Sequence, residues 1–364
     1  MGKFTSGNRL KLTTILCFIV MAGIITFTDA CKKCNKPDHC PNPHGQPSTK
    51  SSSTISENSP VLGTTDTKVV TIANIRKSED GSSAEIMFCQ LSELFTVSDA
   101  SVMSALQEAF DNHKQVRVLV NPYTANVMHA TALSSAEVAG RQVNALIANE
   151  GLAMNLSNIN QDVLDAPQAL GVINTTTPGL TNVIPDMATA QLMFDYITHQ
   201  CCAIPGPYGV DYCISFQYCQ DGCYARAHKM CWIINNMYHY DTHKIFSFAN
   251  SGSDRLSVKA EKWGGCCITW WYHVAPLVNI KTPTGTKAYV FDPAMFDQPV
   301  LLSAWLHAQS NPACSGSAHV SMINIQPTAS YSPATYSGTA FDTDPMYADT
   351  DTTMVHYRPR ISCP

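Results

Sequence analysis

The chain has 364 residues, of which 45% are hydrophobic and 14% are charged, and its formal net charge is -5. This length predicts about two domains, and with no basic stripe to follow a phosphate backbone we expect no nucleic-acid partner. The 15 cysteines exceed what a reduced compartment usually holds, which indicates an oxidising location and several disulfides.

Residues 1–30 have the organisation of a signal peptide. A basic start precedes the apolar run 15–27, which is too short to span a bilayer, and residues 28–30 offer a cleavage site. We therefore expect a secreted, periplasmic or cell-surface protein. Cys31 follows the cleavage site directly, so a lipid on Cys31 would anchor the chain to a membrane, although Asp29 fits a lipobox poorly.

Residues 31–67 are rich in Ser, Thr, Pro, Asn and Lys, and this composition cannot offset the entropy cost of folding. We expect a disordered tether. It contains a cluster of cysteines and histidines, which are residue types that can bind a metal. A local disulfide, next to a Cys31 that is processed after cleavage, is favoured over a metal site. The cluster consists of Cys31, Cys34, His39, Cys40 and His44.

Residues 68–151 are predicted to form a small α+β unit that carries no catalytic constellation. Strands are expected at 69–75, 84–91 and 115–121. One helix is expected from Ser98, with Val102, Leu106 and Phe110 on its buried face. A second is expected over 135–150, with Ala139, Val143, Leu146 and Ile147 buried and Gly151 as its stop.

Residues 152–179 are rich in Asn, Thr and Pro and are predicted to be a linker with a processing site, because proteases cut exposed connections between folded units. The second unit, residues 180–364, is expected to hold the chemistry. Pro185 should open its first helix, with an apolar side made of Leu192, Met193, Tyr196 and Ile197.

Cys223 is the candidate nucleophile. It follows the turn pair Asp221-Gly222 and precedes a run with helix-forming character that extends to about Tyr238. The free N–H groups and the dipole at a helix start favour a thiolate and can stabilise an oxyanion. The alternative is that Cys223 is a disulfide partner, since nine other cysteines follow residue 180.

Nearby histidines are weaker candidates for the base. His228 lies five positions after Cys223 and so points to another side of the helix; we expect a surface or groove histidine. Arg226, three residues on, can share a face with Cys223. His239 and His243 flank Asp241, where a solvated turn is favoured over a metal site.

His273 and Asp292 complete a better constellation. His273 lies in the β-branched and aromatic run 266–275, which predicts a strand, and a histidine there needs a polar partner. Asp292 ends the next predicted strand, 287–292. If these strands pair, Asp292 can orient the imidazole toward Cys223. This order of residues is shared by papain-like and transglutaminase-like cores, so an α/β (α+β) fold is expected.

The second unit resembles the bacterial protein-glutaminase family. The resemblance rests on the nucleophile motif 221–230, on the histidine motif with Cys266-Cys267 and His273, and on Asp292-Pro293. It covers residues 180–314 well and 68–150 more weakly, where it is similar to the family's pro-region. Cys231, Cys219 and Pro276 depart from the family pattern, and the last 50 residues match poorly.

The resemblance implies hydrolysis of the side-chain amide of protein-bound glutamine to glutamate and ammonia, without a cofactor or metal. It implies Cys223 as nucleophile, His273 as general base and acid, Asp292 as orienter, and a thioester intermediate. The expected partners are proteins with accessible glutamine and the chain's own pro-domain as an inhibitor. Ser92-Glu93 lies where the family's pro-region would reach the cleft. There Glu93 would resemble the glutamate product; the alternative is that Glu93 simply faces solvent.

Two other functions stay open at this point. A transglutaminase or a cysteine protease could use the same core. A non-catalytic, disulfide-rich surface module would instead have Cys223 oxidised. Removing the nucleophile from the ten cysteines after residue 180 leaves an odd number, so one should be free or pair outside this unit.

Overall fold

The computed structural model describes residues 65–139, 147–148, 151–156, 179–198, 214–358 and 360–363. These residues form a mixed helix and strand protein, as the sequence predicts. The strands are β1 (Asp66–Lys77), β2 (Ala84–Phe88), β3 (Leu91–Val97), β4 (Gln115–Asn121), β5 (Asn126–Ala132), β6 (Ile147–Ala148), β7 (Leu152–Asn155), β8 (His243–Phe248), β9 (Leu256–Lys259), β10 (Cys267–Trp270), β11 (Tyr272–Thr282), β12 (Gly285–Val290), β13 (Val300–Leu301), β14 (Met322–Gln326), β15 (Ser330–Pro333) and β16 (Ala340–Thr343). The helices are α3 (Ala100–Asp111), α4 (Ser135–Ala139), α6 (Met187–Thr198), α7 (Cys223–Asn236), the short 3₁₀ helix η2 (Glu261–Trp263), α8 (Leu302–Ala308) and α9 (Ala348–Tyr357).

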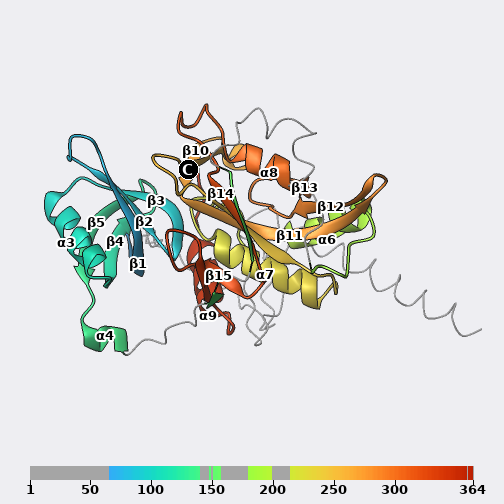
Figure 1. Ribbon diagram of the computed structural model, residues 1–364, viewed down its shortest axis with the longest axis horizontal. Coiled ribbons are helices and arrows are strands. Elements are labelled where there is room, and N and C mark those ends of the chain that lie inside the picture. The colour runs from blue at the N-terminus through green and yellow to red at the C-terminus, as the bar shows by residue number, and fades with distance from the viewer. Residues whose placement is uncertain are drawn as a thin grey trace, which may run out of the picture.

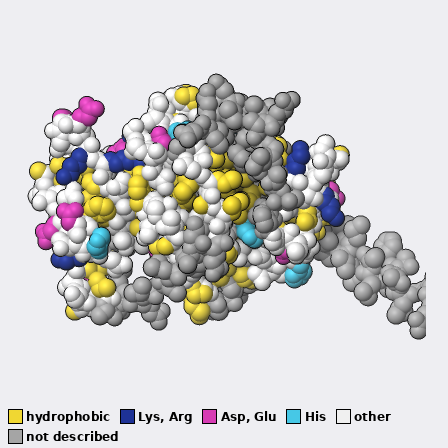
Figure 2. Space-filling model, viewed as in Figure 1, with side chains coloured by type: hydrophobic (Ala, Val, Ile, Leu, Met, Phe, Trp, Pro, Cys, Tyr) yellow, Lys and Arg dark blue, Asp and Glu magenta, His cyan; other side chains and the backbone are white. Residues whose placement is uncertain are grey.

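Strands β1 to β5 form a small closed sheet, coloured blue to green in Figure 1. Their order is β2-β1-β4-β5-β3, and an additional antiparallel pairing of β2 with β3 closes the ring. Helix α3 packs against this ring and buries Val102 and Leu106, as predicted. The unit has a hydrophobic core of its own, and Figure 2 shows acidic and basic side chains interspersed on the face in view.

Two predictions within this unit are wrong in detail. The expected strand 84–91 is in fact two strands, because the chain turns at Cys89 and Gln90 and β3 then folds back on β2. Helix α3 is capped by Asp99 and not by Ser98, since the Asp99 carboxylate accepts hydrogen bonds from the backbone N–H groups of Ser101 and Val102. A carboxylate at this position satisfies two of the helix's unpaired donors.

The ends of this unit also differ from the prediction. The tether expected over 31–67 cannot extend that far, because Asp66 already begins β1; residues 1–64 lie outside the described residues. Of the helix expected over 135–150, the structure describes only α4, and Ile147 belongs to strand β6. The predicted buried residues Val143 and Leu146 lie outside the described residues.

The second unit is built on a six-stranded sheet of order β13-β12-β11-β8-β14-β7. Helix α7 packs against β11, while α8 packs against β12 and β13 and lies on the other side of β11 in the view of Figure 1. The large core between these elements contains aromatic side chains from β8 and β11 together with Trp305 of α8. A three-stranded sheet, β15-β16-β6, completes the unit.

The two units share a continuous sheet. Strand β3 of the first unit pairs antiparallel with β10 of the second, which extends the β1–β5 ring to the seven-stranded order ending in β10-β9. Met87 and Leu94 from the first unit are buried in the core of the second. The first unit therefore lies against the second through both backbone pairing and apolar packing.

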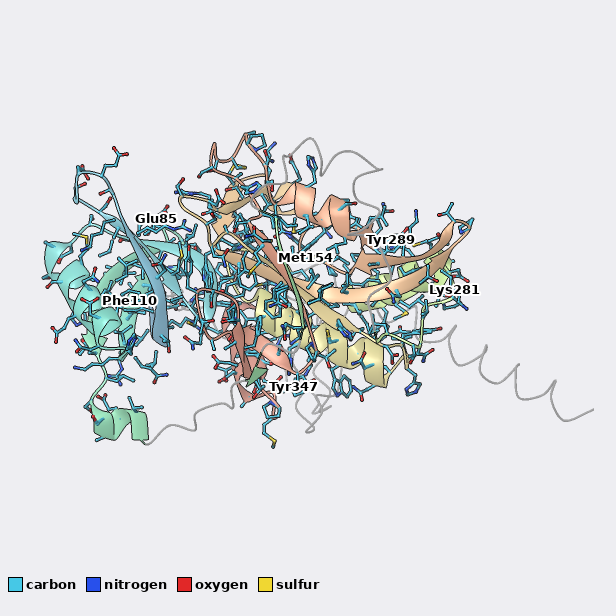
Figure 3. All side chains as sticks on the ribbon, viewed as in Figure 1. Glu85, Phe110, Met154, Lys281, Tyr289 and Tyr347 are labelled. Carbon is cyan, nitrogen blue, oxygen red and sulfur yellow. A yellow bond between two sulfur atoms is a disulfide. The ribbon has the colours of Figure 1, made fainter. Side chains whose placement is uncertain are left out.

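The predicted linker 152–179 is wrong at its start. Strand β7 pairs antiparallel with β14 at the edge of the six-stranded sheet, Met154 packs against that core (Figure 3), and Leu156 is buried within it. The chain reaches β14 closely at Gly151, where an added Cβ would lie 1.8 Å from the carbonyl oxygen of Ile325. Residues 157–178 lie outside the described residues.

Helix α6 follows the predicted start but not the whole predicted face. Pro185 precedes it, and the Asp186 carboxylate accepts a hydrogen bond from the Thr189 N–H. Met193 and Ile197 are buried as expected, whereas Leu192 is 71% exposed. Among the described residues, no helix is both long and apolar enough to cross a membrane.

Two disulfides stabilise the second unit. Cys266 is bonded to Cys363, and Cys267 is bonded to Cys314. Among the described cysteines, the buried thiols that remain reduced are those of Cys89, Cys219, Cys223 and Cys231. The disulfides thus join neighbouring cysteines of one segment to two distant parts of the chain.

Candidate active site

Cys223 is the first residue of α7, as predicted. The preceding Gly222 has a φ of 82°, in the left-handed region, and a Cβ there would lie 2.8 Å from the ring of Tyr357. Only glycine meets both conditions easily. The thiol is not oxidised and Cys223 is only 2% exposed, which excludes the disulfide interpretation of this residue.

His273 and Asp292 come together because their strands are neighbours. Residues 266–275 do not form one strand as expected: the chain breaks at Trp271, and His273 lies near the start of β11. β11 pairs antiparallel with β12, and Asp292 follows the end of β12. The Nε2 atom of His273 lies 2.7 Å from Oδ2 of Asp292, and both side chains are buried.

The pair is strongly polarised. Burial alone would lower the pKa of His273, but the charge and hydrogen bond of Asp292, with a further contribution from Cys223, raise it to about 9. Burial would likewise raise the pKa of Asp292, yet the charge of His273 and hydrogen bonds from His273 and Trp305 hold it below its usual value. The favoured state is therefore an imidazolium beside a carboxylate.

Two tryptophans hold this pair, and the sequence pattern did not single out either. Trp305 of α8 donates its Nε1–H to Oδ2 of Asp292 at 2.9 Å. Trp270 of β10 stacks on the ring of His273, with centroids 4.4 Å apart and an interplanar angle of 6°. Trp270 stands in the aromatic run before His273, which was a usable signal; nothing in the local sequence marks Trp305.

The second ring nitrogen of His273 is available to Cys223. Nε2 is engaged by Asp292, and Nδ1 is buried without a partner of good hydrogen-bond geometry. The thiol of Cys223 acts on the ring as a hydrogen-bonding and electrostatic neighbour. A thiol, an imidazole and a carboxylate in this order can perform nucleophilic acyl transfer.

His228 is buried, which contradicts the expected surface or groove position. Its Nδ1 accepts a hydrogen bond from Nζ of Lys244 at 2.6 Å, and its Nε2 lies 3.1 Å from the backbone oxygen of Asp344. Burial, followed by the charge of Lys244, lowers the pKa of His228 to about 2. His228 is therefore a neutral, doubly hydrogen-bonded histidine that links α7 to Lys244 of β8 and to Asp344.

The other predicted residues take structural positions. Arg226 is buried and donates to the backbone oxygen of Tyr218 at 2.9 Å. Asp241 accepts hydrogen bonds from the backbone N–H groups of Thr181 and Asn182, both at 2.8 Å. No cluster of three His, Cys, Asp or Glu side chains suited to a metal occurs in the part of the chain that the structure describes, and the cysteine and histidine cluster 31–44 lies outside that part.

Strand β3 contacts the turn that precedes α7. Ser92 donates from its backbone N and its Oγ to Oδ1 of Asp221, at 2.8 and 2.9 Å, and its carbonyl oxygen accepts from the Trp271 N–H at 3.1 Å. Glu93 pairs opposite Trp270 and is buried, so the expected solvent-facing alternative is wrong.

Glu93 lies among charged groups at the contact between the two units. Burial raises its pKa well above the usual value, and the charges that act on it most come from Asp221, Arg360, Asp66 and Lys68. Ser92, and not Glu93, makes the direct contact with the nucleophile turn.

Comparison with known proteins finds similarity to one family. Residues 190–309, which include all three candidate residues, match a family model described as glutaminase. A crystal structure of pro-protein-glutaminase is 25% identical, covers 82% of this chain and 95% of its own, and has a TM-score of 0.56. A crystal structure of protein-glutaminase is 34% identical over 50% of this chain and 93% of its own, with a TM-score of 0.42. The NMR structure of protein-glutaminase from Chryseobacterium proteolyticum has the same identity and TM-score over 91% of its own length. None of the curated proteins matches the chain significantly.

Proposed function

This chain belongs to the protein-glutaminase family and has a pro-region ahead of its glutaminase domain, and on that premise we propose that it deamidates protein-bound glutamine. The observation that carries the proposal is the buried pair of His273 and Asp292, 2.7 Å apart, beside the reduced Cys223 at a helix start. We assign Cys223 as the nucleophile, His273 as the general acid and base, and Asp292 as the residue that orients His273.

The mechanism follows from the chemistry of these groups. The thiolate of Cys223 attacks the γ-carbonyl carbon of a glutamine side chain, and N–H groups at the start of α7, which lack partners within the helix, stabilise the oxyanion. His273 gives its proton to the leaving nitrogen, so ammonia departs and a thioester remains. His273 then takes a proton from water as water attacks the thioester, and glutamate and the free thiol are released.

We propose that the folded chain is a latent proenzyme. Strand β3 pairs with β10 and contacts Asp221, two residues before Cys223, and Cys223 itself is only 2% exposed. A glutamine side chain cannot reach a thiol covered in this way. A cut within the 152–179 connector, after β7, would separate the two units covalently and precede activity.

Export is a second part of the proposal. Residues 1–30 have the pattern of a signal peptide, and the disulfides Cys266–Cys363 and Cys267–Cys314 are typical of proteins that leave the reducing cytosol. Expression with and without residues 1–30 tests this, with secretion of the full chain expected. Equal retention of both forms inside the cell would contradict it.

The decisive experiment measures ammonia release from a glutamine-containing protein by the full chain after limited proteolysis, with Cys223→Ala as the matched control. We expect release by the wild type alone. Incorporation of an added amine would indicate a transglutaminase, and new chain ends would indicate a protease. Equal release by wild type and Cys223→Ala would overturn the proposal. The uncut chain should be far less active, and equal activity before and after cleavage would overturn the proenzyme.

A further inference from the structure

The C-terminal segment, where the family resemblance is weakest, lies against the turn that precedes the nucleophile. We name residues 348–358 and 360–363 the C-terminal strap; it consists of α9 and the segment that follows. In Figure 1, α9 lies below the second unit and β10 lies above, both on the side that faces the β1–β5 unit. The strap runs from α9 to β10, because Cys363 is bonded to Cys266 beside the start of β10.

One side chain of the strap contacts both residues that precede the nucleophile. The hydroxyl of Tyr357 donates to Oδ2 of Asp221 at 2.6 Å. The ring of Tyr357 lies so close to Gly222 that an added Cβ would be 2.8 and 3.1 Å from two of its carbons. Tyr357 is 3% exposed, so this contact is made in the interior, where a hydrogen bond to a carboxylate is strong.

The rest of the strap holds the remainder of this turn. The Ser362 N–H donates to the carbonyl oxygen of Gln217 at 2.9 Å, and the Ser362 hydroxyl accepts from the Cys219 N–H. The Gln220 side-chain amide donates to the Ser362 carbonyl oxygen at 2.7 Å. Residues 217–222 have no helix or strand of their own, so these bonds replace the regular ladder that would otherwise fix their conformation.

The disulfide fastens the strap beside the other half of the site. Cys363 is held so close to Gly264 that an added Cβ would lie 2.9 Å from the Cys363 Cβ. Cys266, its partner, precedes β10, whose Trp270 stacks on His273. The strap therefore connects the turn that presents the thiol with the strand that supports the imidazole.

We propose that the C-terminal strap is the positioning element of the active site, with Tyr357 as its principal positioning residue. This inference rests on the proposed deamidase function. Tyr357 touches no reacting atom; it fixes Asp221 and Gly222, and thereby the direction in which α7 presents Cys223 to His273. A displacement of about 1 Å at such a site is enough to cost up to about a hundredfold in rate.

The first test uses Tyr357→Phe, which removes the hydroxyl and keeps the ring against Gly222. Activity is measured as kcat and KM for ammonia release, per titrated Cys223 thiol, with the full chain processed by limited proteolysis. We expect kcat to fall about tenfold and KM to stay within about twofold. Tyr331→Phe is the matched control, because Tyr331 is equally buried and its hydroxyl is not a partner of Asp221.

The second test compares the two disulfides. Cys266→Ser with Cys363→Ser frees the strap, whereas Cys267→Ser with Cys314→Ser removes a disulfide that does not involve the strap. Both pairs should lower the melting temperature, but only the first should lower kcat per titrated thiol.

The outcomes separate this inference from the proposed function. If the wild type releases no ammonia, the deamidase function fails. If the wild type is active and Tyr357→Phe keeps its kcat, or if both disulfide variants lose kcat equally, the strap is structural only and the inference is overturned.

Discussion

Replacing Asp292 with asparagine tests whether charge in the buried His273–Asp292 pair drives the chemistry. The pKa of His273 is raised from 6.5 to about 9, which favours the imidazolium by about 3 kcal/mol at about 1.4 kcal/mol per pH unit. An asparagine oxygen can still accept hydrogen bonds from His273 and from Trp305, the two donors that reach Oδ2 in the wild type. The variant therefore loses the charge and keeps the packing.

We expect Asp292→Asn to lower kcat for ammonia release at neutral pH by about a hundredfold, since about 3 kcal/mol corresponds to about two powers of ten. The assay is ammonia release per titrated Cys223 thiol after limited proteolysis. A kcat within about threefold of the wild type would refute the reasoning.

The same substitution has a signature in stability. Because the folded pKa of His273 lies above its unfolded value, its stabilisation is present in full below pH 6.5 and is lost as the pH rises through about 9. The advantage of wild type over Asp292→Asn in urea unfolding should therefore shrink across this window. An advantage that does not change with pH would show that the charge pair contributes nothing to the difference.

Three further substitutions test the surroundings of the site. Gly222→Ala places a Cβ 2.8 Å from the Tyr357 ring at a positive φ. It should lower the free energy of unfolding in urea by about 1–3 kcal/mol, and an unchanged midpoint would contradict this. Asp66→Asn removes the ion pair with Arg360, 2.5 Å away. The cleaved pro-region should then dissociate about tenfold faster or more, as measured by surface plasmon resonance. Equal off-rates would show that this ion pair does not hold the pro-region. Gly151→Ala places a Cβ 1.8 Å from a β14 carbonyl oxygen. The pairing of β7 with β14 should weaken, so the hydrogen-exchange rate of the β14 amides should rise. Unchanged protection of these amides would mean that β7 tolerates the side chain.

The positions of the three candidate residues could be predicted because their signals are local. A turn pair before a helix-forming run marked the location of Cys223. A polar residue within a β-branched run, and another at the end of a strand, marked His273 and Asp292. Consecutive strands often pair, so the sequence made the proximity of the last two conditional on that pairing, which β11 and β12 show.

Other features depend on contacts between distant segments, which leave no periodic trace. Helix α7 is buried on nearly all sides, and even the charged Lys229 is buried. His228 is buried because Lys244 of β8 provides a donor for it. Strand β7 has four residues in a stretch whose composition predicts a loop, and only the open edge of β14 makes it a strand.

The architecture also constrains how the proposed proenzyme can be activated. A cut within 157–178 leaves β3 paired with β10 and β7 paired with β14, so the cut alone does not separate the two units. Ion pairs hold the same interface at both ends, between Glu85 and Arg255 at 2.7 Å and between Asp66 and Arg360 at 2.5 Å. Because β3 also belongs to the closed β1–β5 ring, it can leave β10 only when the whole unit departs or when the ring unfolds. The contacts between the two units, together with the core that keeps β3 within its ring, would therefore oppose activation of the proposed proenzyme even after the cut.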